Sequence, residues 1–126
     1  MKPLAEEWLS KADEDFRVAE RELAAEPPAF AAVCFHAQQA VEKAMKALLV
    51  DFGVDFPRTH DLKFLLDLIK NNTPIFNDLE EALVNLSVSA VEVRYPGSKP
   101  DRHLAEKAVD VMRDFFSVFS ESFPRG

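Results

Sequence analysis

The chain has 126 residues, 48% of them apolar and 29% charged, with a formal net charge of −7. A length typical of one domain predicts that residues 1–126 form a single domain, and the apolar content excludes a disordered tail. The negative charge argues against broad electrostatic binding to duplex DNA or RNA, because most of the surface repels polyanions and only a local basic pocket could attract them.

Membrane insertion, disulfides and metal sites are not expected either. No apolar run approaches the ~20 residues that span a bilayer. Residues 1–7 turn acidic where a signal peptide would turn apolar, so we expect a cytoplasmic protein. The single Cys34 has no partner for an intramolecular disulfide, and the 3 His residues are spread along the chain. We therefore predict no disulfide, no metal site and no cofactor.

The first predicted helix covers residues 4–25. Its apolar residues recur every three or four positions, which places them on one side of a helix. The residues expected to be buried are Leu4, Trp8, Ala12, Phe16, Ala19 and Leu23. Pro27 and Pro28 end this helix, because neither has a backbone donor.

The second predicted helix, residues 29–52, carries the longest apolar stripe. The stripe consists of Phe30, Cys34, Ala37, Val41, Ala44, Leu48 and Phe52. On a helical wheel of ~100° per residue, a polar group lies on the opposite side. That group consists of His36, Gln39, Lys43 and Lys46. This helix is therefore expected to present one face to the core and another to a polar surface or site, and Gly53 is suited to cap its C-terminus.

Capping signals predict two further helices in the middle of the chain. Thr59 is expected to cap a short helix, and Thr73 followed by Pro74 is typical of the start of another. The residues expected to be buried are Leu62, Leu65, Leu66 and Ile69 in the first, and Ile75, Leu79, Leu83, Leu86 and Ala90 in the second.

A last helix follows a loop at residues 93–99. Ser98 and Asp101 resemble a capping box that opens it, with Leu104, Ala108, Val111, Phe115 and Phe119 facing inward. No alternating strand pattern occurs, and short connections favour antiparallel neighbours. The predicted fold is an all-α, up-and-down bundle of four to five antiparallel helices.

Asp15 is the first candidate site residue, because it lies at the margin of the face that the first helix should bury. A carboxylate in that position needs a partner. Two interpretations stay open. Asp15 could belong to a polar site between helices, or it could form a structural ion pair or reach water at the boundary.

Gln39 and Lys43 share the polar face of the second helix. Lys43 could offer a point charge to a phosphate while Gln39 supplies amide hydrogen bonds, a combination able to hold a nucleotide. An ordinary solvated helix face explains the same residues equally well.

Three more candidates lie in loops. His60 stands at a helix start, where capping accounts for its position more simply than catalysis does. Arg94 and Tyr95 directly follow the fourth helix, and a planar fork donor beside an aromatic ring suits phosphate or base recognition. Alternatively, Arg94 pairs with Asp15 or Glu92. In that case Tyr95 would pack as a lid on the core.

The C-terminal helix contains a cluster of phenylalanines wider than one buried stripe needs. The cluster consists of Phe115, Phe116, Phe119 and Phe123. Part of it is expected to form an exposed patch that a second subunit covers, which predicts a homodimer.

Taken in order, four groups of residues resemble the HEPN (higher eukaryotes and prokaryotes nucleotide-binding) domain family. They are Trp8 and Asp15, then Ala37-Gln38-Gln39-Ala40 with Glu42-Lys43, then His60-Asp61-Leu62, and finally Arg94-Tyr95-Pro96. The likeness spans nearly the whole chain, from Trp8 to Phe119.

The resemblance implies a nucleotide- or RNA-related helical module, commonly dimeric, often found beside a minimal nucleotidyltransferase in toxin–antitoxin or defence systems. The nucleotide contacts expected from it and from the residues are Gln39, Lys43, Arg94, Tyr95, Asp15 and His60. We therefore expect a non-catalytic module that binds a nucleotide or a partner protein.

The alternative is a metal-independent ribonuclease. Relatives with that activity carry an Arg and a His separated by four to six residues, and the pair meets across the dimer. In this chain Arg94 and His103 are separated by eight residues, and neither Arg58 before His60 nor Arg102 before His103 has the required gap. The spacing thus favours a binding module with no catalytic residue.

Overall fold

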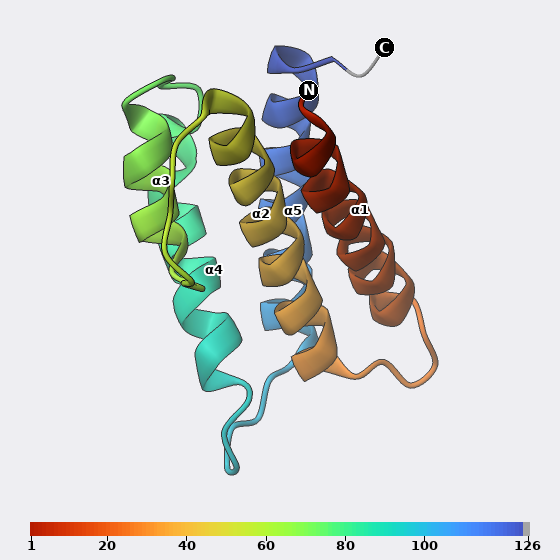
Figure 1. Cartoon of the computed structure of the whole chain (residues 1–126). Coiled ribbons are helices and arrows are strands. Elements are labelled where there is room, and N and C mark those ends of the chain that lie inside the picture. Colours follow the sequence, from red (N-terminus) through yellow and green to blue (C-terminus); the bar gives the residue numbers. More distant parts are fainter. Residues whose placement is uncertain (125–126) are drawn as a thin grey trace.

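The fold is built from helices alone within residues 1–124, the part of the chain that the computed structural model describes. The helices are α1 (Pro3–Leu23), α2 (Phe30–Phe52), α3 (Leu62–Lys70), α4 (Glu80–Glu92) and α5 (Arg102–Ser122), with a 3₁₀ turn, η1 (Asn77–Leu79), before α4 (Figure 1). The all-α prediction is confirmed. None of these helices is long and apolar enough to cross a membrane.

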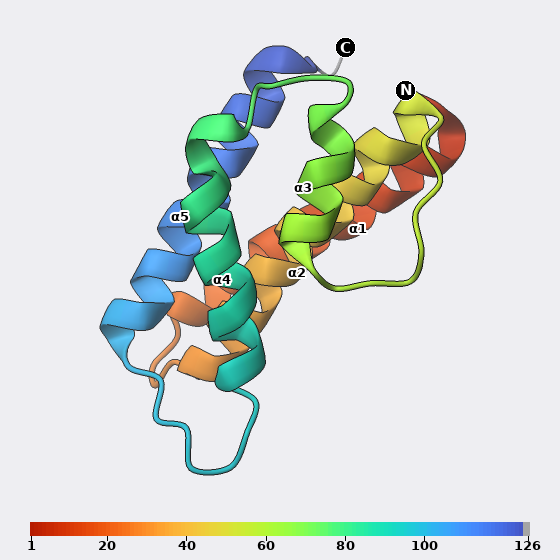
Figure 2. The same cartoon turned by 90° about the vertical axis from the view of Figure 1, so that its left-hand side faces the viewer.

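The four long helices α1, α2, α4 and α5 alternate in direction, which confirms the up-and-down bundle (Figure 1). The α1–α2 hairpin is inclined to the α4–α5 pair (Figure 2). The short helix α3 runs in the same direction as α2, because the segment at residues 53–61 returns along the bundle before α3 begins (Figures 1 and 2). This returning segment forms one border of the polar surface described below.

Helix α2 lies at the centre of the bundle and contacts each of the other four helices. Its predicted core face is confirmed between Cys34 and Leu48, where Cys34, Ala37, Val41, Ala44 and Leu48 are fully buried. Phe30 and Phe52, at the two ends of the predicted stripe, are only half-buried. The helix ends at Gly53, whose φ of 74° is left-handed. Glycine adopts this conformation without the steric cost that a Cβ atom would impose.

The buried face of α1 agrees with the predicted one at Ala12 and Ala19 and differs from it elsewhere. Its buried apolar residues are Ala5, Leu9, Ala12 and Ala19. Leu4 is 54% exposed, so its predicted burial is wrong, while Trp8 and Phe16 are only half-buried. Small alanine side chains let two helices approach closely, and the large rings then cover the edges of the contact. Phe16, for example, packs edge-on against Phe116 of α5, with ring centroids 5.1 Å apart.

Two helix caps also differ from the predicted ones. Asp61, not Thr59, caps α3, since its carboxylate accepts hydrogen bonds from the backbone amides two and three residues later, at 2.9 and 3.3 Å. Asp101 likewise caps α5, accepting from the amide three residues later at 2.9 Å, so Ser98 lies outside the helix. In both cases a carboxylate, which is the stronger acceptor and is favoured by the helix dipole, caps instead of a hydroxyl.

Helix α4 begins at Glu80, later than the Thr73–Pro74 start that the sequence predicts. Phe76 explains the delay. Its ring is buried and stacks on Phe115, with centroids 4.4 Å apart and planes inclined by 17°. The chain turns to insert this ring into the core, and the turn occupies the residues that the sequence assigns to the helix.

The phenylalanine cluster of α5 is mostly covered, so the exposed patch predicted for part of it is limited to two half-buried rings. Phe115 and Phe119 are buried, while Phe116 and Phe123 are half-buried. Phe123 packs on Phe52 of α2, with ring centroids 6.0 Å apart. Phe115 and Phe119 therefore fill the interior of the bundle, and only Phe116 and Phe123 keep part of their surface exposed.

The single cysteine gives a testable pH dependence. Cys34 is fully buried, and burial raises the pKa of its thiol because the thiolate is poorly solvated there. A pKa raised above the unfolded value contributes stability below about pH 8.5 that is lost as the pH rises through the folded pKa. We expect the wild type to lose more free energy of unfolding than Cys34→Ala between neutral and alkaline pH, measured by urea denaturation. Equal losses would contradict the raised pKa.

Candidate functional site

A buried carboxylate from α1 organises one side of the polar face of α2. Asp15 is 8% exposed, and its two carboxylate oxygens contact two residues of α2. Oδ2 lies 2.6 Å from Lys43 Nζ, and Oδ1 lies 2.8 Å from His36 Nδ1. His36 and Lys43 are two helical turns apart, so one carboxylate can bridge them. The structural ion pair expected for Asp15 is present, and the positive charge of Lys43 is largely balanced by it.

The contact with Asp15 fixes the orientation of the His36 ring. A carboxylate accepts hydrogen bonds, so Nδ1 carries the proton and donates to it. The side chain of His36 is 30% exposed, and its Nε2 makes no hydrogen bond within the described residues. A carboxylate-oriented imidazole with a free second nitrogen is a suitable partner for a bound ligand.

A second buried carboxylate, Glu42, organises the other side of the same face. It is 2% exposed and accepts hydrogen bonds from Lys46 Nζ at 3.0 Å and from Gln38 Nε2 at 3.1 Å. His60 Nδ1 lies 3.0 Å from Glu42 Oε1, and the backbone oxygen of His60 accepts from Gln38 Nε2 at 3.1 Å. These contacts attach the segment at residues 53–61 to α2. His60 therefore lies in a structural network rather than beside Asp15.

Gln39 stands between the two carboxylates. Its Nε2 donates to Gln38 Oε1 at 3.1 Å, which joins it to the Glu42 network. Gln39 and Lys43 are both half-exposed. We call the surface formed by His36, Gln39 and Lys43 the polar seam. Its lysine is balanced by Asp15, so the polar seam alone offers hydrogen bonds rather than a free cation.

Arg94 supplies a cation at the edge of the polar seam. Its guanidinium carbon lies 5.4 Å from the ring centroid of Phe35, and the rings of Phe35 and His36 meet edge-on with centroids 5.2 Å apart. Arg94 forms no ion pair within the described residues, so neither predicted pairing, with Asp15 or with Glu92, is found. Tyr95 is 66% exposed, so the alternative in which it covers the core is wrong.

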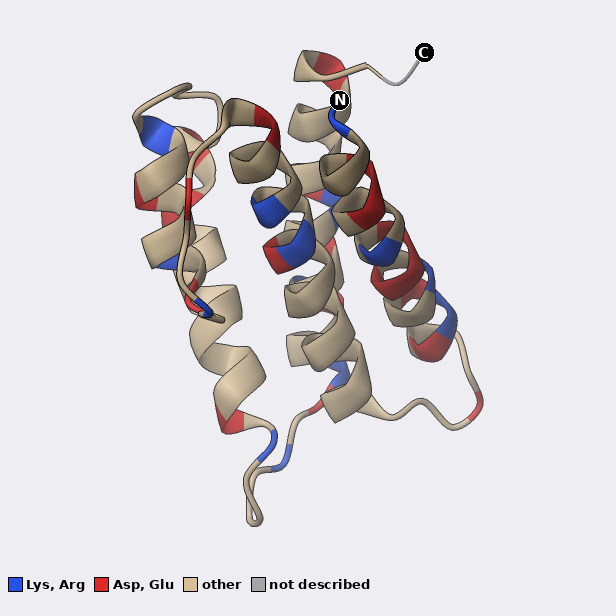
Figure 3. Ribbon diagram, viewed as in Figure 1, with Lys and Arg blue, Asp and Glu red and all other residues tan. Residues whose placement is uncertain are grey.

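The loop at residues 93–101 carries further positive charge at the same end of the bundle (Figure 3). Arg102, at the start of α5, places its guanidinium carbon 5.3 Å from the ring centroid of Phe30 at the start of α2. Two arginines therefore lie on phenylalanine rings of the first turns of α2. Residues 93–102 hold Arg94, Lys99 and Arg102 against one carboxylate, Asp101, so this segment is positive although the whole chain carries a net charge of −7.

Within residues 1–124, no group of three or more His, Cys, Asp or Glu side chains is placed to hold a metal ion. Any ligand chemistry of this region would thus depend on hydrogen bonds, the two arginines and aromatic rings. That set of groups suits an anion attached to a planar ring, as in a nucleotide.

Comparison with protein families identifies the fold that carries this site. The family model described as the HEPN domain matches residues 5–122. The chain belongs to the HEPN domain family. The order of motifs in the sequence therefore corresponds to a real relationship, and the polar seam lies on the second helix of this HEPN domain.

Two solved structures resemble this HEPN domain over almost its full length. The protein TT1696 from Thermus thermophilus is 29% identical, with a TM-score of 0.81, and the alignment covers 94% of this chain and 98% of that chain. ST0689, described as an archaeal HEPN homologue, is 25% identical, with a TM-score of 0.73 and coverage of 96% and 98%. A search of curated proteins gave no match.

Sequence reasoning missed His36 and Phe35 as site residues. The helical wheel places His36 beside Lys43, so a shared partner for the two could have been inferred. The contact between Phe35 and Arg94 joins residues far apart in the sequence, and no local pattern signals it. His103 is exposed and makes no hydrogen bond or ring contact within the described residues.

Proposed function

We propose that this HEPN domain is a non-catalytic module that binds a nucleotide or the end of a short RNA at the polar seam and Arg94. The observation that carries the proposal is the guanidinium of Arg94 held on the Phe35 ring, next to a His36 ring that Asp15 orients. A planar fork donor and an imidazole nitrogen together can bind phosphate oxygens.

The neighbouring groups suit the rest of a nucleotide. Tyr95 exposes most of its ring at the same loop, and stacking on an aromatic side chain is a common way to bind an unpaired base. The half-exposed amide of Gln39 can accept and donate hydrogen bonds to a sugar or base edge. Lys43 contributes less free charge than the sequence suggests, because Asp15 balances it, which favours modest rather than tight binding.

The absence of catalysis in this proposal is supported by the spacing of arginine and histidine. In ribonuclease relatives four to six residues separate the Arg from the His, whereas eight residues separate Arg94 from His103. Arg94 contacts Phe35, and Arg102 contacts Phe30, so each guanidinium is held against α2. We further propose that the domain acts with a minimal nucleotidyltransferase in a toxin–antitoxin or defence-type system, as the family resemblance implies.

Calorimetric titration of the purified protein with ATP, GTP and short RNAs tests the binding function. We expect Arg94→Ala to weaken the measured affinity at least about tenfold, the loss of roughly one phosphate contact. Arg58→Ala is the matched control, since Arg58 is also exposed but lies in the segment before α3, and it should bind like the wild type.

Three results would contradict the proposal. If the titrations give no heat of binding with any of these ligands at about 0.1 mM protein, the proposal that the domain binds a nucleotide is wrong. Equal weakening by Arg94→Ala and Arg58→Ala would mean that only overall charge matters. If the wild type cleaves total RNA and Arg94→Ala does not, the domain is a ribonuclease and not a non-catalytic binding module. Co-purification from the native host would test the nucleotidyltransferase partner.

A further inference from the structure

A second carboxylate–imidazole pair lies outside the polar seam, between α2 and the segment at residues 53–61. His60 Nδ1 lies 3.0 Å from Oε1 of Glu42 and 3.2 Å from its Oε2. The side chain of Glu42 is 3% exposed, whereas that of His60 is 75% exposed. Because an ionised carboxylate only accepts hydrogen bonds, Nδ1 carries the proton, and Nε2 of the neutral ring is an acceptor. Within residues 1–124, this Nε2 makes no hydrogen bond.

The main chain on both sides of this ring is also held in place. The backbone oxygen of His60 accepts from Gln38 Nε2 at 3.1 Å. The amide of Leu62 donates to Ser87 Oγ at 3.4 Å, which joins the segment to α4. The cap of α3 is supplied by Asp61, so the outward nitrogen of His60 takes no part in capping. Nε2 is thus presented in a fixed position, which lowers the entropic cost of binding a ligand there.

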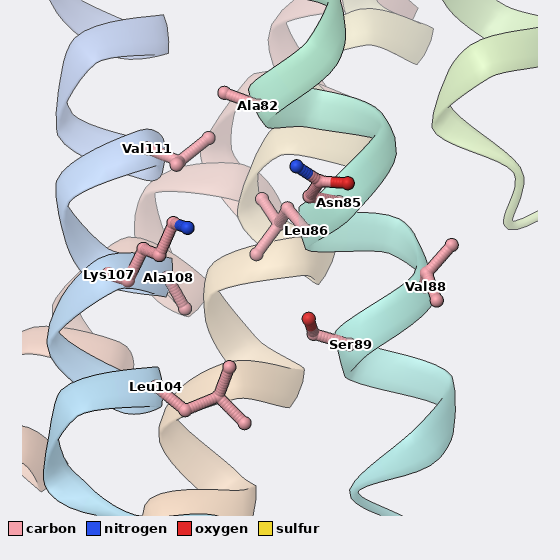
Figure 4. Close-up of a pocket in the computed structure, with 9 residues that line it drawn as sticks. All are labelled: Ala82, Asn85, Leu86, Val88, Ser89, Leu104, Lys107, Ala108 and Val111. Carbon is pink, nitrogen blue, oxygen red and sulfur yellow. The ribbon is translucent and has the colours of Figure 1, made fainter.

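A groove of about 580 Å³ lies beside the ring, between residues 59–63 and α4. Sites for small molecules have volumes of roughly 300 to 1,000 Å³. Three valines line the groove from α4, namely Val84, Val88 and Val91. Val88 extends from α4 on the side away from α5 (Figure 4), and it is 51% exposed. The groove therefore offers an apolar surface next to an accepting nitrogen.

The free charges of the groove are negative. The carboxylate of Glu92 lines it and forms no ion pair or hydrogen bond within the part of the chain that the structure describes. Asp61 also lines it, and both of its capping bonds are made by Oδ1, which leaves Oδ2 free. Lys63, the cation among the lining residues, is bonded to both carboxylate oxygens of Asp67, at 2.6 and 2.7 Å. A ligand here has to supply hydrogen-bond donors and positive charge.

We propose that the groove between residues 59–63 and α4 binds a small aliphatic amine or guanidine. The cationic group donates to His60 Nε2 and pairs with Glu92, and the alkyl stem lies on the valines. An anion is repelled by Glu92, and a ligand without donors removes water from Nε2 without replacing its hydrogen bond. The groove shares no residue with the polar seam, Arg94 or Tyr95, so this site is independent of the proposed function.

Titration of the isotope-labelled full chain with n-butylammonium, followed by NMR, tests the site. We expect the imidazole signals of His60 and the methyl signals of Val84 and Val88 to shift together. The dissociation constant should be on the order of 1 mM, because so small a ligand makes few contacts. Butyrate has the same stem with the opposite charge, and tetramethylammonium has the charge without an N–H donor. Neither should shift these signals.

Two variants and a matched control make the test specific. Glu92→Ala should weaken binding of n-butylammonium at least about tenfold, the effect of one lost charge-assisted hydrogen bond. Glu81→Ala is the control, because Glu81 is an exposed carboxylate of the same helix that does not line the groove, and it should bind like the wild type. His60→Phe keeps an aromatic ring but lacks the accepting nitrogen, and it should weaken binding to a similar extent.

Three results would overturn the proposal. The first is no shift of these signals at about 10 mM n-butylammonium. The second is an equal shift with tetramethylammonium, since hydrogen bonding would then play no part. The third is equal weakening by Glu92→Ala and Glu81→Ala, which would mean that the ligand responds only to the net charge of −7. Weakening by Glu92→Ala alone supports the site even if His60→Phe fails to fold.

Discussion

Replacing Ala44 by aspartate is expected to lower the free energy of unfolding by about 4 kcal/mol or more, enough to unfold many small domains. Ala44 is fully buried on the core face of α2, the helix that contacts all the others. A carboxylate there would lose its hydration without gaining a partner, and it would also need space that the packed core lacks. Urea denaturation followed by far-UV circular dichroism would measure the loss.

The same substitution elsewhere in α2 provides the control. Ala29 is the N-cap residue of this helix, is exposed, and has no capping side chain. Aspartate accepts hydrogen bonds from the first free amides of a helix and is favoured by the helix dipole. Ala29→Asp should therefore be neutral or stabilise the protein by up to about 1 kcal/mol. A melting temperature unchanged by Ala44→Asp would contradict the assigned core face.

The core face of α2 was predictable because its apolar residues recur at helical spacing and the residues on the opposite side of the helix are polar. The buried face of α1 was predictable only in part, because hydrophobicity gives most weight to Trp8 and Phe16, whereas alanines occupy the contact. An alanine has little hydrophobic weight of its own, and its burial depends on how closely the neighbouring helix approaches. That distance is set by the whole bundle and not by the local sequence.

The contacts of the candidate site likewise depend on how the helices pack, which the local sequence does not determine. The need of Asp15 for a partner followed from its position on the wheel, but the identity of its partners depends on how α1 is rotated against α2. The link between Arg94 and His36 passes through Phe35 and joins the end of α4 to α2. Periodicity within one helix carries no information on such contacts, so it predicts which polar residues share a face of α2 but not which residues of other helices reach that face.

The Glu42–Lys46 pair is buried in the structure, although the sequence alone suggests a pair on the surface. In the sequence they form an ordinary surface pair one helical turn apart. In the fold their side chains are only 3% and 8% exposed, because the returning segment and α1 cover them. The Lys46 ammonium lies 5.4 Å from the ring centroid of Trp8 and 5.9 Å from that of Phe56. The pair is thus buried beneath two aromatic rings.

Glu42→Leu is therefore expected to lower the free energy of unfolding by about 3 kcal/mol, because it leaves the Lys46 charge buried without its carboxylate. The double variant Glu42→Leu/Lys46→Met should recover most of that loss, since an apolar pair of similar volume needs no compensation. Urea denaturation of the wild type, both single variants and the double variant closes a cycle that isolates the interaction. Additive losses in the double variant would show that the two side chains are not coupled, and would contradict the buried ion pair.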